Sequence, residues 1–310
     1  SNKITHIFFK YFIIIYRMFN SEHCSPDNKD TKYSCLTLKM LKQIAKALNK
    51  HNKNEGVGSK RIKLTGSKAE LHKNISEEIK KISDCSNEKC WIKINIIKDE
   101  LGSEYEDFLE SFRPTMPEKW KKERNAWLST SDIDKVMEQY EDAYPNFKYM
   151  GANPIDFDLK LGNSCVSGDI CNIDVEDIKK QKKKSLGMVF NTDPHNKSGQ
   201  HWFSVFVDLD GMNIPGVPCI YHFDSLAMKP TKEIYGLVDK ITNQCREIDK
   251  DIEFLFNTEK HQNGNTECGI YCLHFLVNML KGVNFEEYIT NKRNDKEIEQ
   301  FRDIFYIPPE

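Results

Sequence analysis

The chain has 310 residues, of which 39% are hydrophobic and 30% are charged, and its formal net charge is −2 at pH 7. This length suits one large domain or two ordinary ones, and the composition is typical of a globular protein. A net charge so close to zero excludes a chain-wide attraction to nucleic acid or to a membrane surface, so any basic site must be local.

Ten cysteines are scattered along the chain, and several lie within apolar stretches. We interpret them as buried free thiols of a reducing, intracellular compartment, because disulfide frameworks are typical of short secreted chains. Cys85 and Cys90 resemble half of a zinc site, but no second Cys/His pair follows at ligand spacing. We therefore expect no metal and no cofactor.

Residues 1–34 are predicted to form a flexible or weakly ordered lead-in. Residues 7–16 are mostly apolar, but this stretch is too short to span a bilayer and lacks a small-residue cleavage site. We interpret it as a docked helix and expect no membrane partner. Residues 18–34 are polar and contain a Pro-Asp-Asn turn sequence, which favours a flexible segment.

Residues 35–115 are predicted to form a helical arm domain. Apolar residues recur at three- and four-residue steps over residues 36–48 and again over residues 71–82, which predicts two amphipathic helices. A third helical region is expected over residues 91–112.

The first two helices and the link between them resemble a SAP-type helix-extension-helix module, on residues 38–48 and on the Thr-Gly-Ser-Lys-Ala-Glu-Leu stretch at 65–71. Such modules often bind DNA through basic residues around the extension. The resemblance implies that DNA would be contacted by Lys60, Arg61, Lys63 and Lys68. The alternative, which we rank first, is a helical subdomain that packs on the rest of the chain or on a substrate.

Pro114 and Pro117 interrupt the helical pattern and mark a domain boundary, so residues 116–310 are predicted to form a second domain. A helix with Asp132 near its start is expected over residues 131–144, whereas residues 145–180 show no clear period. Alternating or apolar stretches then predict strands at residues 186–190, 201–209, 217–223 and 252–256, and a strongly apolar helix at 267–280. This order predicts an α+β domain with a mixed sheet and a buried helix.

Cys268 is the candidate nucleophile, because it lies at the start of the apolar helix, after a turn-rich loop. The positive end of a helix dipole favours a thiolate. Gly269 would let a substrate carbonyl approach the backbone closely. Gln262, in the preceding loop, could join the Cys268 backbone N–H in an oxyanion hole for acyl transfer.

A thiolate of this kind needs a base that is oriented by a third group. His201 opens one predicted strand and Asp224 closes a later one, so the two side chains could meet near the helix start. Rival residues remain at this stage: they are the bases His195 and His222, the acids Asp208 and Asp210, and the neighbouring thiol Cys272, which we interpret as a core residue.

The segments around these residues resemble the clan of cysteine proteases that contains the ubiquitin-like-protein (SUMO) proteases and adenain. The resemblance covers roughly residues 120–308 and rests on His-Trp at 201–202, Phe-Asp-Ser-Leu at 223–226 and Gln-Asn-Gly-Asn-Thr-Glu-Cys-Gly at 262–269. It implies a papain-related fold with Cys268 as nucleophile, His201 as base, Asp224 as orienting acid and Gln262 in the oxyanion hole.

Trp127-Leu128 resembles the Trp-Leu motif of the clan, whose Trp walls a tunnel over a diglycine, so substrate binding is expected at Trp127, Trp202 and Gly269. The clan often continues with Asn-Asp, whereas this chain has Ser129-Thr130. The helical arm is also atypical of SUMO proteases. The combination of an arm with this catalytic domain looks more like the virion-maturation proteases of nucleocytoplasmic large DNA viruses.

The resemblance therefore implies a cysteine endopeptidase that cleaves structural-protein precursors after Gly-Gly-like motifs, in the virion and the host cytoplasm. The first alternative is a protease that removes SUMO or another ubiquitin-like protein, whose tail would then be the substrate. The second alternative is a DNA-associated scaffold with an inert protease-like domain. The presence of all four candidate residues argues against this scaffold.

Overall fold

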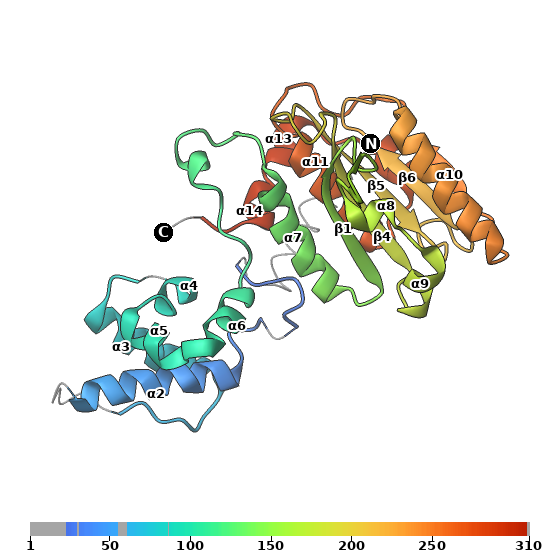
Figure 1. Ribbon diagram of the computed structural model, residues 1–310. Helices are drawn as coiled ribbons and strands as arrows, with labels where there is room; N and C mark the ends of the chain where they lie inside the picture. Colours follow the sequence, from blue (N-terminus) through green and yellow to red (C-terminus); the bar gives the residue numbers. More distant parts are fainter. Residues whose placement is uncertain (1–22, 30, 55–60, 86, 309–310) are drawn as a thin grey trace. The chain divides into compact units, whose positions relative to one another are not determined.

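The computed structural model describes residues 23–29, 31–54, 61–85 and 87–308. The chain divides into two compact units (Figure 1): Ser1–Thr115 together with Tyr306–Glu310, and Met116–Phe305. Each unit has an apolar core of its own. The predicted helix at residues 7–16 and the candidate DNA-binding residue Lys60 lie outside the described residues.

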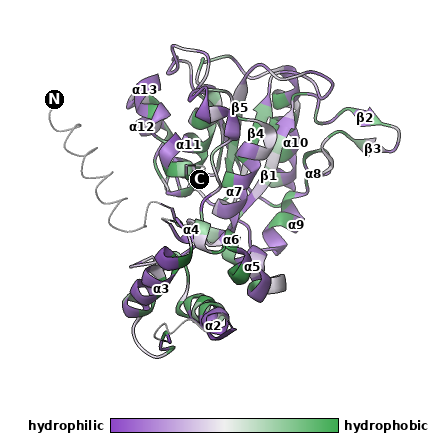
Figure 2. Cartoon of the chain, turned by 90° about the vertical axis from the view of Figure 1, so that its left-hand side faces the viewer, coloured by the Kyte–Doolittle hydropathy of each residue, from purple (hydrophilic) through white to green (hydrophobic). Residues whose placement is uncertain are grey.

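The first unit is helical. Its elements are α2 (Leu38–Asn54), α3 (Lys68–Ile82), α4 (Glu88–Trp91), α5 (Asn95–Leu101), the short 3₁₀ helix η1 (Gly102–Glu104) and α6 (Tyr105–Glu110). Figure 2 shows hydrophobic and hydrophilic residues on different sides of α2, as the sequence period predicts. Ser67 and Glu70 form a reciprocal capping box that fixes where α3 begins.

One expectation for this unit was wrong. The third helical region is not continuous: α5 ends at Leu101, before Gly102, whose φ of +52° is disfavoured for residues with a side chain, and shorter helices follow. The start of the described chain, within the predicted flexible or weakly ordered lead-in, is hydrogen-bonded to the end of this unit: the Arg113 N–H donates to the carbonyl of His23, and the Ser25 N–H donates to that of Ser111.

The cysteine prediction was also wrong for six of the ten residues. Disulfides join the pairs Cys24–Cys35, Cys85–Cys90 and Cys165–Cys171. The partners are separated by 11, 5 and 6 positions, so each bridge closes a short loop whose turn brings the two Cα atoms within 5.0–6.2 Å. The free thiols are all buried: Cys219, Cys245, Cys268 and Cys272.

The second unit is built around a mixed sheet with the order β1-β4-β5-β6-β7. The strands are β1 (Phe147–Pro154), β4 (Ser185–Asn191), β5 (Trp202–Asp208), β6 (Cys219–Phe223) and β7 (Glu253–Phe256). The inner pairs are antiparallel and the two outer pairs are parallel. All residues of β4, β5 and β6 are buried, because helices cover both faces of the sheet.

Figure 1 shows these helices in two layers, with α7 and α11 on one side of the sheet and α9 and α10 on the other. The bounds are α7 (Thr130–Ala143), α8 (Gly168–Cys171), α9 (Val175–Lys180), α10 (Lys232–Glu247) and α11 (Cys268–Leu280). The remaining elements are η2 (Glu118–Lys121), α12 (Phe285–Thr290), α13 (Asp295–Glu299), α14 (Arg302–Phe305) and a small hairpin of β2 (Lys160–Leu161) and β3 (Ser164–Cys165). This arrangement confirms the predicted α+β class with a mixed sheet and a buried helix.

Strand β1 and helix α10 are among the elements that the sequence analysis missed. Strand β1 contains a register shift between Tyr149 and Ala152, where Gly151 has a φ of +84°, and this irregularity hides the alternation. Helix α10 was not assigned, although its apolar residues recur at helical spacing against the sheet. The four predicted strands and the helix at 267–280 agree with β4, β5, β6, β7 and α11 to within one or two residues.

Candidate active site

Cys268 is the first residue of α11 and is 2% exposed. Nearly the whole helix is buried, so packing fixes its axis and its first turn. The backbone N–H of a first helical residue has no partner within the helix, and it remains available for an oxygen atom near the thiol. The fold therefore holds one thiol and one backbone donor together at the end of a rigid element.

His201 lies directly before β5, and Asp224 lies directly after β6. The antiparallel pairing of Ser204 with Phe223 places these two strand ends side by side. His201 Nε2 lies 2.9 Å from Asp224 Oδ1, and the two side chains are 10% and 2% exposed. Since Nε2 faces the carboxylate, Nδ1 is the ring nitrogen left for the Cys268 sulfur.

Burial by itself would lower the pKa of the His201 imidazole. The hydrogen bonds and charges of Asp224 and Cys268 outweigh it and raise the pKa of His201 to about 9. An imidazole with this pKa carries a proton at neutral pH. The surroundings of His201 thus favour an imidazolium beside the thiol, which is the arrangement of an activated cysteine.

Asn257 supports Asp224 and was not foreseen from the sequence. The Asp224 N–H donates to Asn257 Oδ1 at 2.9 Å, and Asn257 Nδ2 donates to the Asp224 carbonyl at 2.7 Å. The Leu226 N–H also donates to Asp224 Oδ1 at 2.7 Å. The only sequence signal for Asn257 is its position directly after β7.

Gln262 is 1% exposed, and hydrogen bonds fix its side chain at both ends. Its Oε1 accepts from the Ser225 hydroxyl at 2.7 Å, and its Nε2 donates to the Gly264 carbonyl at 3.0 Å. An amide nitrogen carries two hydrogens, so a second N–H remains for another acceptor. This orientation suits an oxyanion donor.

The expected substrate-binding residues lie around Leu128. Trp202 donates its indole N–H to the Leu128 carbonyl at 3.0 Å, whereas Trp127 is 40% exposed. A Cβ atom added to Gly269 would lie 3.0–3.3 Å from the Leu128 side chain. Gly269 is therefore required for the close approach of Leu128, and its contact with a substrate carbonyl stays a prediction.

The rival residues have other surroundings. His195 pairs with Asp156 through Nδ1 and Oδ2 at 2.7 Å. Burial lowers the pKa of His222 to about 4, so this ring is neutral at pH 7. Asp208 accepts the N–H of Asn213 at 2.8 Å, as expected of a turn residue.

Among the residues that the structure describes, no cluster of three or more His, Cys, Asp or Glu side chains could hold a metal ion. Within the same residues, no helix is long and apolar enough to cross a membrane.

Comparison with known proteins connects this geometry to viral enzymes. No protein-family model matches the chain. A protein named as a thiol protease from Acanthamoeba polyphaga mimivirus is 27% identical over 299 residues, which cover 91% of this chain and 92% of the relative. This chain is a cysteine protease.

Two further matches belong to African swine fever virus. Its SUMO-1 cysteine protease is 23% identical to the present protease over 255 residues, covering 77% of this chain and 91% of the relative. A crystal structure of the African swine fever virus protease superimposes with a TM-score of 0.65 at 20% identity, covering 92% of this chain and 95% of that one. The similarity to this structure supports the α+β fold.

Proposed function

We propose that this protease is an endopeptidase in which Cys268 is the nucleophile, His201 the base and Asp224 the group that orients His201. The observation that carries the proposal is the position of His201, which contacts Asp224 and interacts with Cys268 inside a buried site. These three residues lie at the ends of two strands and at the start of a helix. If they served only to stabilise the fold, they would not need to meet in this order.

The reaction follows from this geometry. His201 holds the proton given up by the Cys268 thiol, and the Cys268 sulfur attacks the scissile carbonyl carbon. The second N–H of Gln262 and the backbone N–H of Cys268 donate to the oxyanion. The C–N bond then breaks, the imidazolium protonates the departing amine, and water activated by His201 hydrolyses the thioester.

We infer that the substrate is a protein cleaved after small residues, with Gly-Gly-like motifs preferred. Leu128 contacts the face of Gly269, and the exposed ring of Trp127 follows directly from this segment. A substrate residue without a side chain passes most easily between such a wall and the start of α11. The relatives reported above are viral proteins, which supports processing of structural-protein precursors in the virion and the host cytoplasm.

Removal of a ubiquitin-like protein is the second candidate. The observation that favours it is the name of the African swine fever virus relative, a SUMO-1 cysteine protease. The two candidates share the chemistry and differ in what must lie on the amino-terminal side of the bond. A folded ubiquitin-like domain is needed in one case, and a short Gly-Gly peptide suffices in the other.

The test is a cleavage screen with internally quenched peptides that carry Gly-Gly-X, Ala-Gly-X and Ala-Ala-X sites, run on the wild type, Cys268→Ala and His201→Ala. We expect cleavage at the Gly-Gly sites and no turnover by Cys268→Ala, because loss of a triad member costs several orders of magnitude. Wild-type rates in Cys268→Ala would exclude the proposed nucleophile. Labelling by a SUMO-tail vinyl sulfone without peptide cleavage would favour the second candidate.

DNA contact through the helical unit is a separate proposal. Arg61 and Lys63 are exposed on the link between α2 and α3. The Asn49 side chain donates to the Ile62 carbonyl and accepts the Ile62 N–H, and these two hydrogen bonds fix the backbone between Arg61 and Lys63. Duplex DNA binding should weaken steeply with salt and disappear when Arg61 and Lys63 are changed to Glu. If the protein does not bind DNA at low salt, the helical unit is a protein-docking or packing element. The same result would exclude the DNA-associated scaffold.

A further inference from the structure

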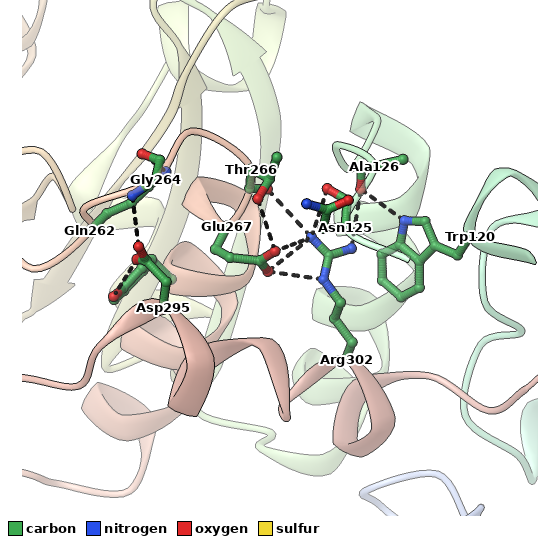
Figure 3. A network of polar contacts seen from close by, with 10 residues as sticks. Trp120, Asn125, Ala126, Gln262, Gly264, Thr266, Glu267, Asp295 and Arg302 are labelled. Carbon is green, nitrogen blue, oxygen red and sulfur yellow. Dashed lines mark hydrogen bonds and ion pairs between the residues drawn. The ribbon is translucent and has the colours of Figure 1, made fainter. Parts of the chain in front are cut away.

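Residues that follow α11 in the sequence return to the loop that carries Gln262 and leads to Cys268. Figure 3 shows this network, in which Arg302 and Asp295 reach the loop from α14 and α13. Neither residue belongs to the proposed triad or to the oxyanion donors.

Arg302 binds the residue next to the nucleophile. Its Nε donates to Glu267 Oε2 at 2.9 Å, and its Nη2 donates to Glu267 Oε1 at 3.0 Å, which is a two-point contact between planar groups. Arg302 is fully buried and Glu267 is 4% exposed. Because Glu267 directly precedes Cys268, this contact fixes the backbone from which α11 begins.

The same guanidinium contacts the segment that leads to Trp127. Nη1 donates to the Ala126 carbonyl at 3.1 Å, and Trp120 donates its indole N–H to the same oxygen at 2.8 Å. The guanidinium also stacks 4.2 Å from the centre of the Trp120 ring. One side chain therefore joins the nucleophile's backbone to the segment that carries Trp127.

Asp295 holds the other end of the loop. Its carboxylate accepts the N–H of Asn263 at 3.0 Å and that of Gly264 at 2.7 Å, and it accepts the Tyr271 hydroxyl at 3.1 Å. The Gly264 carbonyl in turn accepts one N–H of Gln262. Asp295 thus holds the backbone of Gly264, the residue whose carbonyl orients the proposed oxyanion donor.

We propose that Arg302 and Asp295 are positioning residues. Arg302 fixes the Cys268 backbone relative to the segment that carries Trp127, and Asp295 fixes the orientation of the Gln262 side chain. The inference rests on the proposed function, because it gives Cys268 and Gln262 their catalytic roles. A buried ion pair contributes little net stability compared with apolar side chains of similar volume. The partners of Arg302 are the Glu267 carboxylate and the backbone carbonyls of two loops at the site, which explains why a fully buried arginine stands there.

The experiment compares Arg302→Lys and Asp295→Asn with the wild-type protease by kcat, by KM on a Gly-Gly peptide, and by the pH profile of Cys268 alkylation with iodoacetamide. Lysine keeps the charge but cannot contact both oxygens of Glu267 and the Ala126 carbonyl at once. Arg302→Lys should lower kcat by about 10²-fold, the effect of a displacement of roughly 1 Å, and should raise KM and shift the alkylation profile.

Asp295→Asn should give a different signature. Alkylation by iodoacetamide does not use the oxyanion donor, so the alkylation profile should remain that of the wild type. The value of kcat should fall by at least about tenfold, since one misplaced oxyanion donor accounts for up to 10²–10³-fold. KM should stay unchanged.

Asp303→Asn is the matched control. Asp303 follows Arg302 in α14 and forms an exposed ion pair with Arg124 at 2.7 Å, with side chains 63% and 39% exposed. This variant should keep all wild-type constants. If Arg302→Lys fails to fold, the double variant Arg302→Met/Glu267→Met replaces the buried pair with apolar side chains and should fold with the same loss of kcat.

The outcomes separate the two claims. Folded Arg302 variants with wild-type kcat, KM and alkylation profile would overturn the positioning role, while an inactive Cys268→Ala would leave the proposed function standing. Peptide cleavage by Cys268→Ala would instead overturn the function itself.

Discussion

At the scale of single residues, the pKa of His201 gives a directional prediction. Burial opposes the proton, but Asp224 and Cys268 raise the pKa to about 9, above the usual value of 6.5. The imidazolium form is therefore favoured in the folded protein. Its contribution to stability is complete below pH 6.5 and is lost as the pH rises through about 9.

We expect kcat/KM for a Gly-Gly peptide to decline on the alkaline side as His201 loses its proton near pH 9. Asp224→Asn should move this decline to lower pH, because the carboxylate charge that favours the imidazolium is removed. The measurement is a pH–rate profile of both proteins. An unshifted alkaline limb in Asp224→Asn would contradict the role of Asp224.

The side chain of Gln262 gives a second prediction at this scale. Gln262→Ala should lower kcat by about 10²-fold with little change in KM, because a single oxyanion donor acts in the transition state. Ser225→Ala removes only the hydrogen bond to Gln262 Oε1 and should cause a smaller loss of kcat. An effect on KM alone would place Gln262 in substrate binding.

At the scale of elements, helix α11 and the Leu128 segment are packed too closely for a side chain at position 269. A Cβ there would lie 3.1 Å from Leu128 Cβ, which is attached to the backbone and cannot move aside cheaply. Leu128 also accepts the indole N–H of Trp202, so its displacement would disturb a second element.

Gly269→Ala is therefore expected to destabilise the protein by about 1–3 kcal/mol, the usual cost of overpacking, and to raise KM. Thermal unfolding and peptide kinetics measure the two effects. Gly236→Ala is the matched control: Gly236 lies within α10, and a Cβ there meets no atom within 4 Å. This control should be stabilising by up to about 1 kcal/mol.

At the scale of the whole molecule, every residue of the proposed chemistry lies in Met116–Phe305, which is a compact unit with its own core. We propose, as the sequence suggested, that the helical arm serves docking and that the protease domain carries the chemistry. Trp120 and Arg302 contact each other near the two ends of this unit, so a fragment must retain both.

A fragment of residues 116–305 should cleave short peptides at a rate close to that of the whole chain. It should lose efficiency on a large precursor, because docking through the arm would be absent. Peptide kinetics and precursor processing, measured on the same preparations, test the two halves. A folded fragment without peptidase activity would show that the arm helps to build the active site.

The sequence alone determined the elements whose signals are local. Strands β4–β7 and helix α11 were predictable because burial on one or both faces leaves a pattern in consecutive residues, and the order His, Asp, Gln, Cys was readable because each residue stands where an element begins or ends. The contact between His201 and Asp224 followed from the expected pairing of two strands. Strand β1, with its bulge at Gly151, gave no such pattern.

Only the tertiary structure decided which distant residues contact the residues of the candidate site. These residues are Asn257, Asp295 and Arg302, and each lies in a polar stretch of the sequence. Their sequence neighbours do not indicate which residues they contact. The three disulfides likewise depend on which turns bring two Cα atoms into range. The physical reason is the same in each case. Whether two separate segments form a hydrogen bond or a disulfide depends on the path of the folded chain, whereas the burial of a helix or strand leaves a pattern of apolar residues in its own sequence.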